Sequence, residues 1–140
     1  MKTLVVDASV AVKWFFPEIH SVCALDILRS DCQICAPDLV WSEVSNVIWK
    51  RWRRKQISRN EGSAIIYDLI RFPLKIHASD TLAPIAWGIS TQTDQSFYDS
   101  LYLALAIKTN CRLITADRKF FEVICGTDFK SNISWIEEKS

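Results

Sequence analysis

The sequence predicts an α/β fold in which a parallel sheet is covered by helices on both faces. Strand-like and helix-like segments alternate along the 140 residues, which is the pattern that builds parallel sheets. The strand-like segments are continuous apolar runs, as expected for strands that are buried on both faces. Hydrophobic residues make up 49% of the chain, which is enough for a substantial core. We therefore expect a single domain over residues 1–140.

Short apolar segments are expected to form the strands. Each is rich in β-branched or other apolar residues and ends at a residue that stops a strand or caps a helix, such as Pro37 or Asp117. In chain order, the expected strands cover residues 3–7, 32–36, 73–78, 111–116 and 133–136.

The segments between these strands have apolar residues at helical spacing. Ser9, Asp38 and Asp80 are candidate N-caps. The helix expected over residues 96–110 is apolar almost all round, which predicts that it is buried. In chain order, the expected helices cover residues 9–16, 19–30, 39–55, 59–72, the residues after Asp80, 96–110 and 117–124.

The composition excludes several functional classes. The three glycines form neither a dinucleotide-binding motif nor a P-loop. Five cysteines without a second C-x-x-C favour buried thiols in a reducing cytoplasm over disulfides or a zinc site. No apolar run reaches the ~18 residues of a membrane span, and the N-terminus lacks a secretory signal pattern. We therefore expect a cytoplasmic protein that does not insert into a membrane.

Two aspartates follow expected strands directly. Asp7 comes after the apolar run of the first strand, and Asp117 comes after the strand over residues 111–116. Ligands of open parallel sheets bind at the carboxyl ends of the strands, so both side chains are candidates for a binding site. The alternative is that each aspartate only caps the helix that follows it.

Two further acids lie on apolar helix faces. Glu43 shares a face with Leu39 and Val47, and Asp99 shares a face with Leu103. A carboxylate that faces the core needs a partner, because an unpaired buried charge is costly. The partner of Glu43 is either an arginine or a functional ligand. For Asp99, the alternative to a functional role is a favourable interaction with the helix dipole.

Four carboxylates at one sheet edge would repel one another and raise one another's pKa values. A divalent cation removes this conflict, and an all-oxygen donor set favours Mg²⁺ or Mn²⁺. Such an ion can activate a water molecule and stabilise the leaving oxygen of a phosphodiester.

The segments VVDASVAVKWFFPE, LVWSEVSNVIWK and SFYDSLYLALAIKTNCRLITADRKFFE resemble, in order and spacing, the blocks of PIN-domain ribonucleases, especially the VapC-type toxins of toxin–antitoxin pairs. The resemblance covers essentially the whole chain, although residues 56–90 share only the helix and strand pattern. It implies a three-layer α/β/α fold and a Mg²⁺- or Mn²⁺-dependent endoribonuclease. It also implies an RNA substrate, a cognate antitoxin and a homodimer.

The resemblance also assigns roles to individual residues. The acidic quartet of the family corresponds to Asp7, Glu43, Asp99 and Asp117 as catalytic and metal-binding residues, with Asp7 and Asp99 as the most direct ligands. Ser9 and Thr115 correspond to polar residues beside the site. Asp94 is a further acid whose place in the family pattern is not defined.

The segment WKRWRRK over residues 49–55 combines cations with two tryptophans. Lys50, Arg53 and Arg54 share one side of the expected helix, and Trp52 could offer a flat surface for a base. This pattern favours contacts with RNA phosphates and bases. Docking of an acidic antitoxin segment is a second possibility. The third is a solvated helix end whose tryptophans pack in the core.

Three other functions remain as alternatives. A PIN-domain nuclease that processes RNA would have no antitoxin, and a non-catalytic interaction module would keep the fold without metal affinity. A phosphoryl-transfer protein with a nucleophilic aspartate also has acids at strand ends, but no second acid adjoins Asp7 in a D-x-D pattern.

Overall fold

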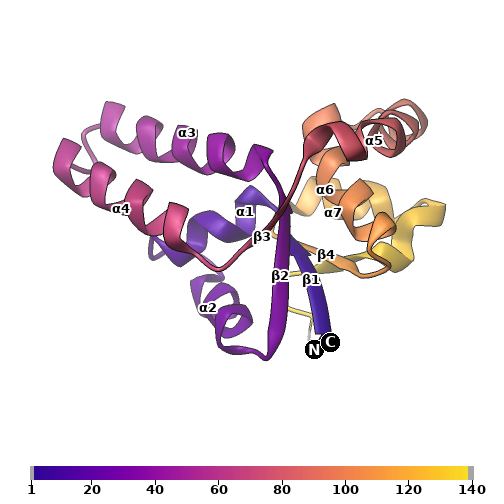
Figure 1. The fold of residues 1–140 in the computed structure, drawn as a ribbon, viewed down its shortest axis with the longest axis horizontal. Helices are drawn as coiled ribbons and strands as arrows, with labels where there is room; N and C mark the ends of the chain where they lie inside the picture. Colours follow the sequence, from indigo (N-terminus) through magenta and orange to yellow (C-terminus); the bar gives the residue numbers. More distant parts are fainter. Residues whose placement is uncertain (1, 139–140) are drawn as a thin grey trace.

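The computed structural model describes residues 2–138, which form a sheet with helices on both sides (Figure 1). The sheet contains five strands in the order β3-β2-β1-β4-β5. Every neighbouring pair of strands is parallel. The strands are β1 (Lys2–Val6), β2 (Cys32–Pro37), β3 (Lys75–His77), β4 (Arg112–Thr115) and β5 (Ile133–Trp135). The parallel sheet expected from the sequence is confirmed.

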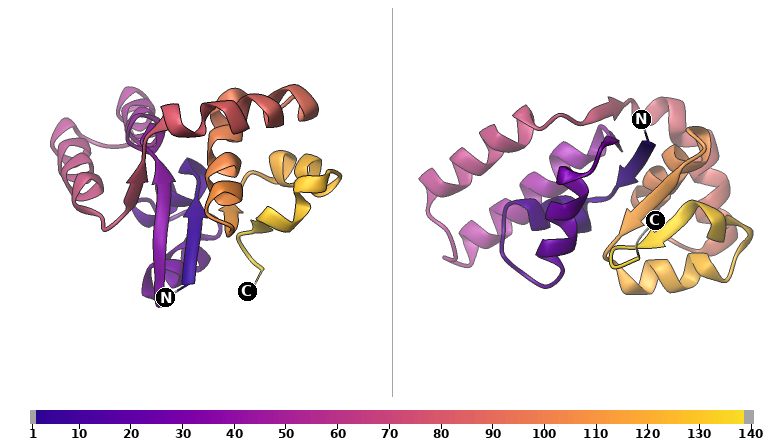
Figure 2. Two further views of the ribbon diagram at one scale, coloured as in Figure 1. Left: turned by 45° about the vertical axis from the view of Figure 1, so that its right-hand side comes forward. Right: turned by 90° about the horizontal axis from the view of Figure 1, so that it is seen from below.

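The helices form two layers, one on each side of the sheet. Those that connect β1, β2 and β3 lie on one side, and α5, α6 and α7 lie on the other (Figures 1 and 2). This three-layer arrangement confirms the predicted fold class. The α-helices are α1 (Ala8–Ala11), α2 (Ser21–Arg29), α3 (Leu39–Arg53), α4 (Arg59–Arg71), α5 (Ser79–Thr93), α6 (Phe97–Lys108) and α7 (Arg118–Cys125). Two short 3₁₀ helices are η1 (Val12–Trp14) and η2 (Asp128–Asn132).

Strand β1 lies at the centre of the sheet because its residues are apolar on both faces. Val5 pairs with Cys35 of β2 on one side and with Leu113 of β4 on the other. Val5 and Val6 are fully buried. The parallel register brings the carboxyl ends of β1 and β4 side by side. The residues that follow these two strands therefore meet at one edge of the sheet.

Helix α6 is the most buried helix, as its sequence predicts. Its residues from Ser100 to Ala106 are all buried. It packs against α5 on one side and against β1, β2 and β4 on the other. Because α6 packs against β1, β2 and β4, Asp99 in its first turn lies near the carboxyl ends of these strands.

The structure corrects the three predicted helix caps. Ser9 lies inside α1, and the N-cap is Asp7, whose side chain accepts a hydrogen bond from the Val10 N–H. Asp38 occupies the N-cap position of α3 without capping it, because its carboxylate accepts hydrogen bonds from Ser79. Asp80 lies in the first turn of α5, which begins one residue earlier.

The cysteines are all free thiols. Cys35 is buried, Cys125 is exposed, and the other three are partly buried. Free thiols are what the sequence predicts. The further expectation that the thiols are buried holds for Cys35 and is wrong for Cys125. Within residues 2–138, no helix is long and apolar enough to cross a membrane.

Candidate active site

Asp7 lies at the centre of the strand-end edge and is 7% exposed. Its Oδ1 accepts a hydrogen bond of 2.5 Å from the Ser9 hydroxyl, and its Oδ2 accepts one of 2.5 Å from the Thr115 hydroxyl. Burial raises the pKa of the Asp7 carboxyl to about 6, although these hydroxyls and the Val10 N–H act in the opposite direction. The site therefore holds this carboxylate in place at an electrostatic cost.

Ser9 and Thr115 connect the two halves of the site. Besides donating to Asp7, the Ser9 oxygen accepts a hydrogen bond of 3.0 Å from the Ala116 N–H. The Thr115 oxygen accepts one of 3.1 Å from the Asp117 N–H. The prediction that both residues line the site agrees with these contacts, which tie the end of β4 to the start of α1.

Glu43 projects from α3 toward α6. The Tyr102 hydroxyl donates a hydrogen bond of 2.6 Å to Glu43 Oε1, and Tyr102 is 1% exposed. Burial raises the pKa of the Glu43 carboxyl, Tyr102 lowers it, and the Asp99 charge raises it further. The partner of Glu43 is therefore a tyrosine, and among residues 2–138 no arginine pairs with it.

Tyr102→Phe is expected to shift the pH dependence of any activity that needs ionised Glu43. Loss of the hydroxyl removes the contact that lowers the Glu43 pKa, so the acidic limb of the pH profile should move to higher pH. The same change should lower the free energy of unfolding by about 1 kcal/mol. Thermal melts and a pH profile test this. An unchanged acidic limb would contradict the assignment of Glu43.

Asp99 is the acid whose charge interacts with each of the other three. It lies in the first turn of α6 and is partly buried. Burial raises the pKa of its carboxyl, and the Asp117 charge raises it further. The Asp99 charge in turn raises the pKa values of Asp7 and Glu43. Asp99 therefore interacts electrostatically with each of the other three predicted acids.

Asp117 caps α7 and is exposed. Its Oδ1 accepts a hydrogen bond of 3.1 Å from the Phe120 N–H. The capping role and the place in the site are therefore not alternatives, because the same carboxyl group serves both. Asp7 likewise caps a helix, α1, and is also a predicted residue of the site. Asp94 is the exposed C-cap of α5.

Comparisons with known proteins identify the family of this chain. The sequence profile of the PIN domain matches residues 4–124. This chain belongs to the PIN domain family. It is 32% identical over 121 residues to Ribonuclease VapC3 of Pyrobaculum aerophilum, a match that covers 85% of this chain and 92% of that protein.

Two solved structures show the fold of this PIN domain. The crystal structure of PAE2754 from Pyrobaculum aerophilum superposes with a TM-score of 0.69 at 20% identity, covering 97% of this chain and 85% of the other. VapBC2 from Rickettsia felis, crystallised with a DNA fragment from its promoter, superposes with a TM-score of 0.64 at 14% identity, covering 95% and 98%.

The candidate donor atoms of this PIN domain are of the chemical type that a hard divalent cation prefers. It consists of carboxylate oxygens whose burial and mutual repulsion a cation would relieve. Among residues 2–138, however, no group of three or more histidine, cysteine, aspartate or glutamate side chains is placed to hold a metal ion. This is compatible with Mg²⁺, which usually binds one or two carboxylates and keeps several waters.

The basic segment at the end of α3 lies apart from the acids. Lys50, Trp52, Arg53 and Arg54 are all exposed. Glu43 and Arg53 are ten residues apart on one helix, which is a separation of about 15 Å along its axis. The predicted basic contacts therefore lie on a separate part of the surface from Glu43.

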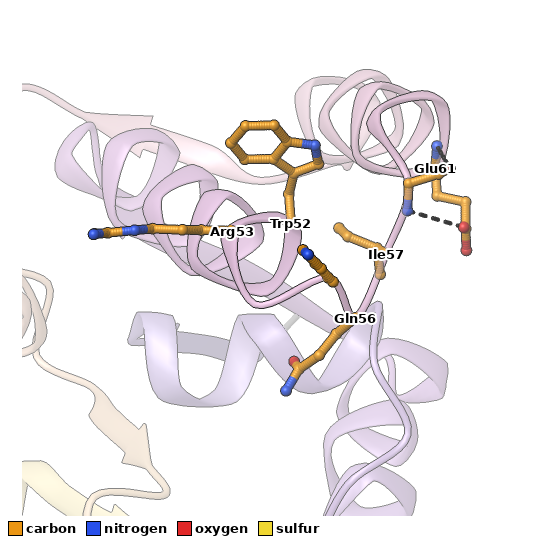
Figure 3. Close-up of a pocket in the computed structure, with 7 residues that line it drawn as sticks. Trp52, Arg53, Gln56, Ile57 and Glu61 are labelled. Carbon is orange, nitrogen blue, oxygen red and sulfur yellow. Dashed lines mark hydrogen bonds between the residues drawn. The ribbon is translucent and has the colours of Figure 1, made fainter.

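The two tryptophans of this segment are on the surface, which is a correction to the interpretation that they pack in the core. Trp49 is 46% exposed and Trp52 is 47% exposed. Arg53 lies 5.4 Å from the centre of the Trp49 ring. Figure 3 shows Trp52, Gln56 and Ile57 beside an open hollow of about 620 Å³ where α3 turns into α4.

Sequence reasoning missed Tyr102 as part of the site. A signal was present, because Tyr102 follows Asp99 by three residues and so shares its helix face. It is also the one polar aromatic side chain among the buried residues of an otherwise apolar helix. Its bond to Glu43 joins two helices that are distant in sequence, so the sequence alone gives no reason to pair them.

Proposed function

We propose that this PIN domain is a metal-dependent endoribonuclease and the toxin of a type II toxin–antitoxin pair. The observation that carries the proposal is the arrangement of Asp7, Glu43 and Asp117 around Asp99 at the carboxyl edge of the sheet. The name of the Pyrobaculum aerophilum relative, Ribonuclease VapC3, supports an RNA substrate. The Mycobacterium tuberculosis structure VapC20, which is titled a Sarcin-Ricin loop cleaving toxin, has the same fold with a TM-score of 0.63 at 14% identity, covering 81% and 87%.

In the proposed mechanism, Asp7 and Asp99 would hold Mg²⁺ or Mn²⁺, with Glu43 and Asp117 as further candidate ligands. The ion supplies a polarised water and charge neutralisation at the phosphodiester. Ser9 and Thr115 fix the orientation of Asp7. Tyr102 fixes Glu43, whose raised pKa suits a group that takes a proton from the attacking water.

The basic segment supplies a surface for the partners of the enzyme. Lys50, Arg53 and Arg54 would neutralise RNA phosphates or contact an acidic segment of the antitoxin, and Trp52 would stack on a base or an apolar side chain. A bound antitoxin is supported by the structural neighbours that are toxin–antitoxin complexes. A homodimer and a cytoplasmic location remain predictions.

The test is cleavage of a mixed RNA panel with Mg²⁺, with Mn²⁺ or with EDTA. The wild-type protein is expected to cleave only with metal, and Asp99→Asn is expected to lose activity by about 10²-fold or more. Asp94→Asn is the matched control, because Asp94 is exposed with a φ of 57° and asparagine accepts this left-handed backbone conformation. It should keep full activity.

Other outcomes distinguish the alternatives. Equal activity of the wild type and Asp99→Asn would contradict the proposed site. If neither protein cleaved RNA and calorimetry showed no Mn²⁺ binding, the non-catalytic interaction module would be favoured. Metal-dependent cleavage that no neighbouring antitoxin gene product suppresses would favour an RNA-processing nuclease.

A further inference from the structure

Arg118 is a cation that follows Asp117 in the chain and has no acidic partner among the described residues. Arg118 is the first residue of α7 and directly follows Asp117. Its guanidinium carbon lies 3.9 Å from the centre of the Trp135 ring. Among residues 2–138, no hydrogen bond or ion pair involves the Arg118 guanidinium. Its N–H donors are therefore available to a ligand.

Trp135 is a fixed platform for this guanidinium. It is 7% exposed, and its Nε1–H donates a hydrogen bond of 3.0 Å to Glu137. The His20 ring packs edge-on against it at 5.6 Å, and Phe121 lies at 5.9 Å on the side of α7. A guanidinium that stacks on a ring held in this way has already lost much of its freedom before any ligand arrives.

The platform belongs to the same edge of the sheet as the acids. Trp135 is the register partner of Thr115 across β4 and β5. Thr115 donates its hydroxyl hydrogen to Asp7. Neighbouring strands are about 4.8 Å apart, so the ring under Arg118 lies one strand away from the residue that orients Asp7. Arg118 is thus connected to the site both through Trp135 and through its chain neighbour Asp117.

We propose that Arg118 binds a backbone phosphate of the RNA strand next to the phosphate that is cleaved, an inference that depends on the proposed function. The carboxylates of the proposed site repel the phosphates of the substrate wherever no metal neutralises them. A planar guanidinium at the rim gives the strand a bidentate anion site in a fixed position. Trp135 acts as a positioning residue through Arg118.

The experiment measures binding of a fluorescein-labelled single-stranded RNA in EDTA, as a function of salt, for Arg118→Ala and for Lys119→Ala. Lys119 is the matched control, because it is the next residue of the same helix and is also exposed. Arg118→Ala is expected to weaken binding about fivefold and to reduce the slope of log affinity against log salt by about 0.7. Lys119→Ala should leave the slope unchanged.

Steady-state cleavage and an Arg118→Lys variant separate binding from structure. Arg118→Ala should raise KM with little change in kcat, because the contact forms equally in the ground state and the transition state. Arg118→Lys keeps the charge without the planar fork, so it should fall between the wild type and Arg118→Ala. A change confined to the melting temperature or to kcat would mean a structural role and would overturn the inference.

The inference and the proposed function fail in different ways. Wild-type cleavage of RNA combined with equal salt slopes for Arg118→Ala and Lys119→Ala would overturn the role of Arg118 and leave the nuclease intact. A wild-type protein that neither cleaves nor binds RNA would overturn the proposed function, and the role of Arg118 with it.

Discussion

Asp7→Asn is expected to stabilise the metal-free protein at neutral pH and to abolish its nuclease activity. Burial raises the pKa of Asp7 from 3.8 to about 6 in the folded protein. The native state therefore binds more protons than the unfolded state between these values, so stability falls as the pH rises through this window. Above about pH 6, burial of the ionised Asp7 carboxylate lowers the free energy of unfolding by its full amount, on the order of 2–3 kcal/mol.

Asparagine is neutral and caps a helix about as well as aspartate, so it avoids the penalty and keeps the contact with the Val10 N–H, although its amide nitrogen cannot accept the hydrogen bond from the Thr115 hydroxyl. We expect a gain of about 2 kcal/mol at pH 7.5 in EDTA, and a flatter dependence of stability on pH between about 4 and 6. Activity should fall on the order of 10³-fold, because the proposed metal ligand would lose its charge. Denaturant melts across pH and RNA cleavage measure the two effects.

Asp117→Asn is the matched control for stability. Asp117 is also an N-cap at a strand end, but it is exposed. Its replacement should change the free energy of unfolding by less than about 0.5 kcal/mol. If Asp7→Asn kept its nuclease activity, Asp7 would be only a helix cap. If it destabilised the protein at neutral pH, the raised pKa would be wrong.

Glu18→Ala is expected to destabilise the protein strongly, because it breaks a network that contains a buried cation. Lys13 is 7% exposed, and its Nζ lies 3.0 Å from Glu18 Oε1. Arg51 of α3 donates to Glu18 Oε2 at 2.6 Å and also stacks on Phe16, 4.1 Å from the ring centre. Removing Glu18 leaves Lys13 without its counter-charge, at a cost of about 2–3 kcal/mol after allowance for the partial exposure of Glu18.

An exposed ion pair provides the matched control. Arg29 and Asp26 are 3.6 Å apart on α2, with side chains 74% and 65% exposed. Asp26→Ala should therefore cost no more than about 0.5 kcal/mol. Glu18→Gln keeps an acceptor for Lys13, so its loss in the free energy of unfolding should lie between those of Glu18→Ala and Asp26→Ala. Equal small losses for Glu18→Ala and Asp26→Ala, measured by denaturant melts, would show that the Lys13 charge is satisfied by water.

The architecture was predictable because each strand is marked by a local apolar run and each helix by its own periodicity. The caps were less predictable, and Asp38 shows why. Its carboxylate is satisfied by Ser79, which is distant in sequence and comes close only when β2 and β3 pair. Ser9 is displaced as a cap for a similar reason, since its hydroxyl bonds to Asp7 and to the end of β4.

The four acids could be singled out as candidates from the sequence because each stands where a neutral or apolar residue would be expected. Their partners could not be found in this way. Tyr102 and Glu43 come from helices in opposite layers and meet through one hydrogen bond, and Arg118 meets Trp135 because α7 packs against β5. The exposure of Trp49 and Trp52 depends on how far α3 extends beyond the sheet, which no local pattern encodes.

The position of β1 in the middle of the sheet has a consequence during protein synthesis. The ribosome makes β1 before the other strands of the sheet, and β4, its neighbour on one side, is made only after β2 and β3. Asp7 and Glu43 therefore exist on the nascent chain long before Asp99 and Asp117 can join them. A partly made chain has an unpaired central strand and an incomplete acidic cluster. The order of synthesis thus keeps the candidate site from assembling until β4 and the start of α7 have left the ribosome.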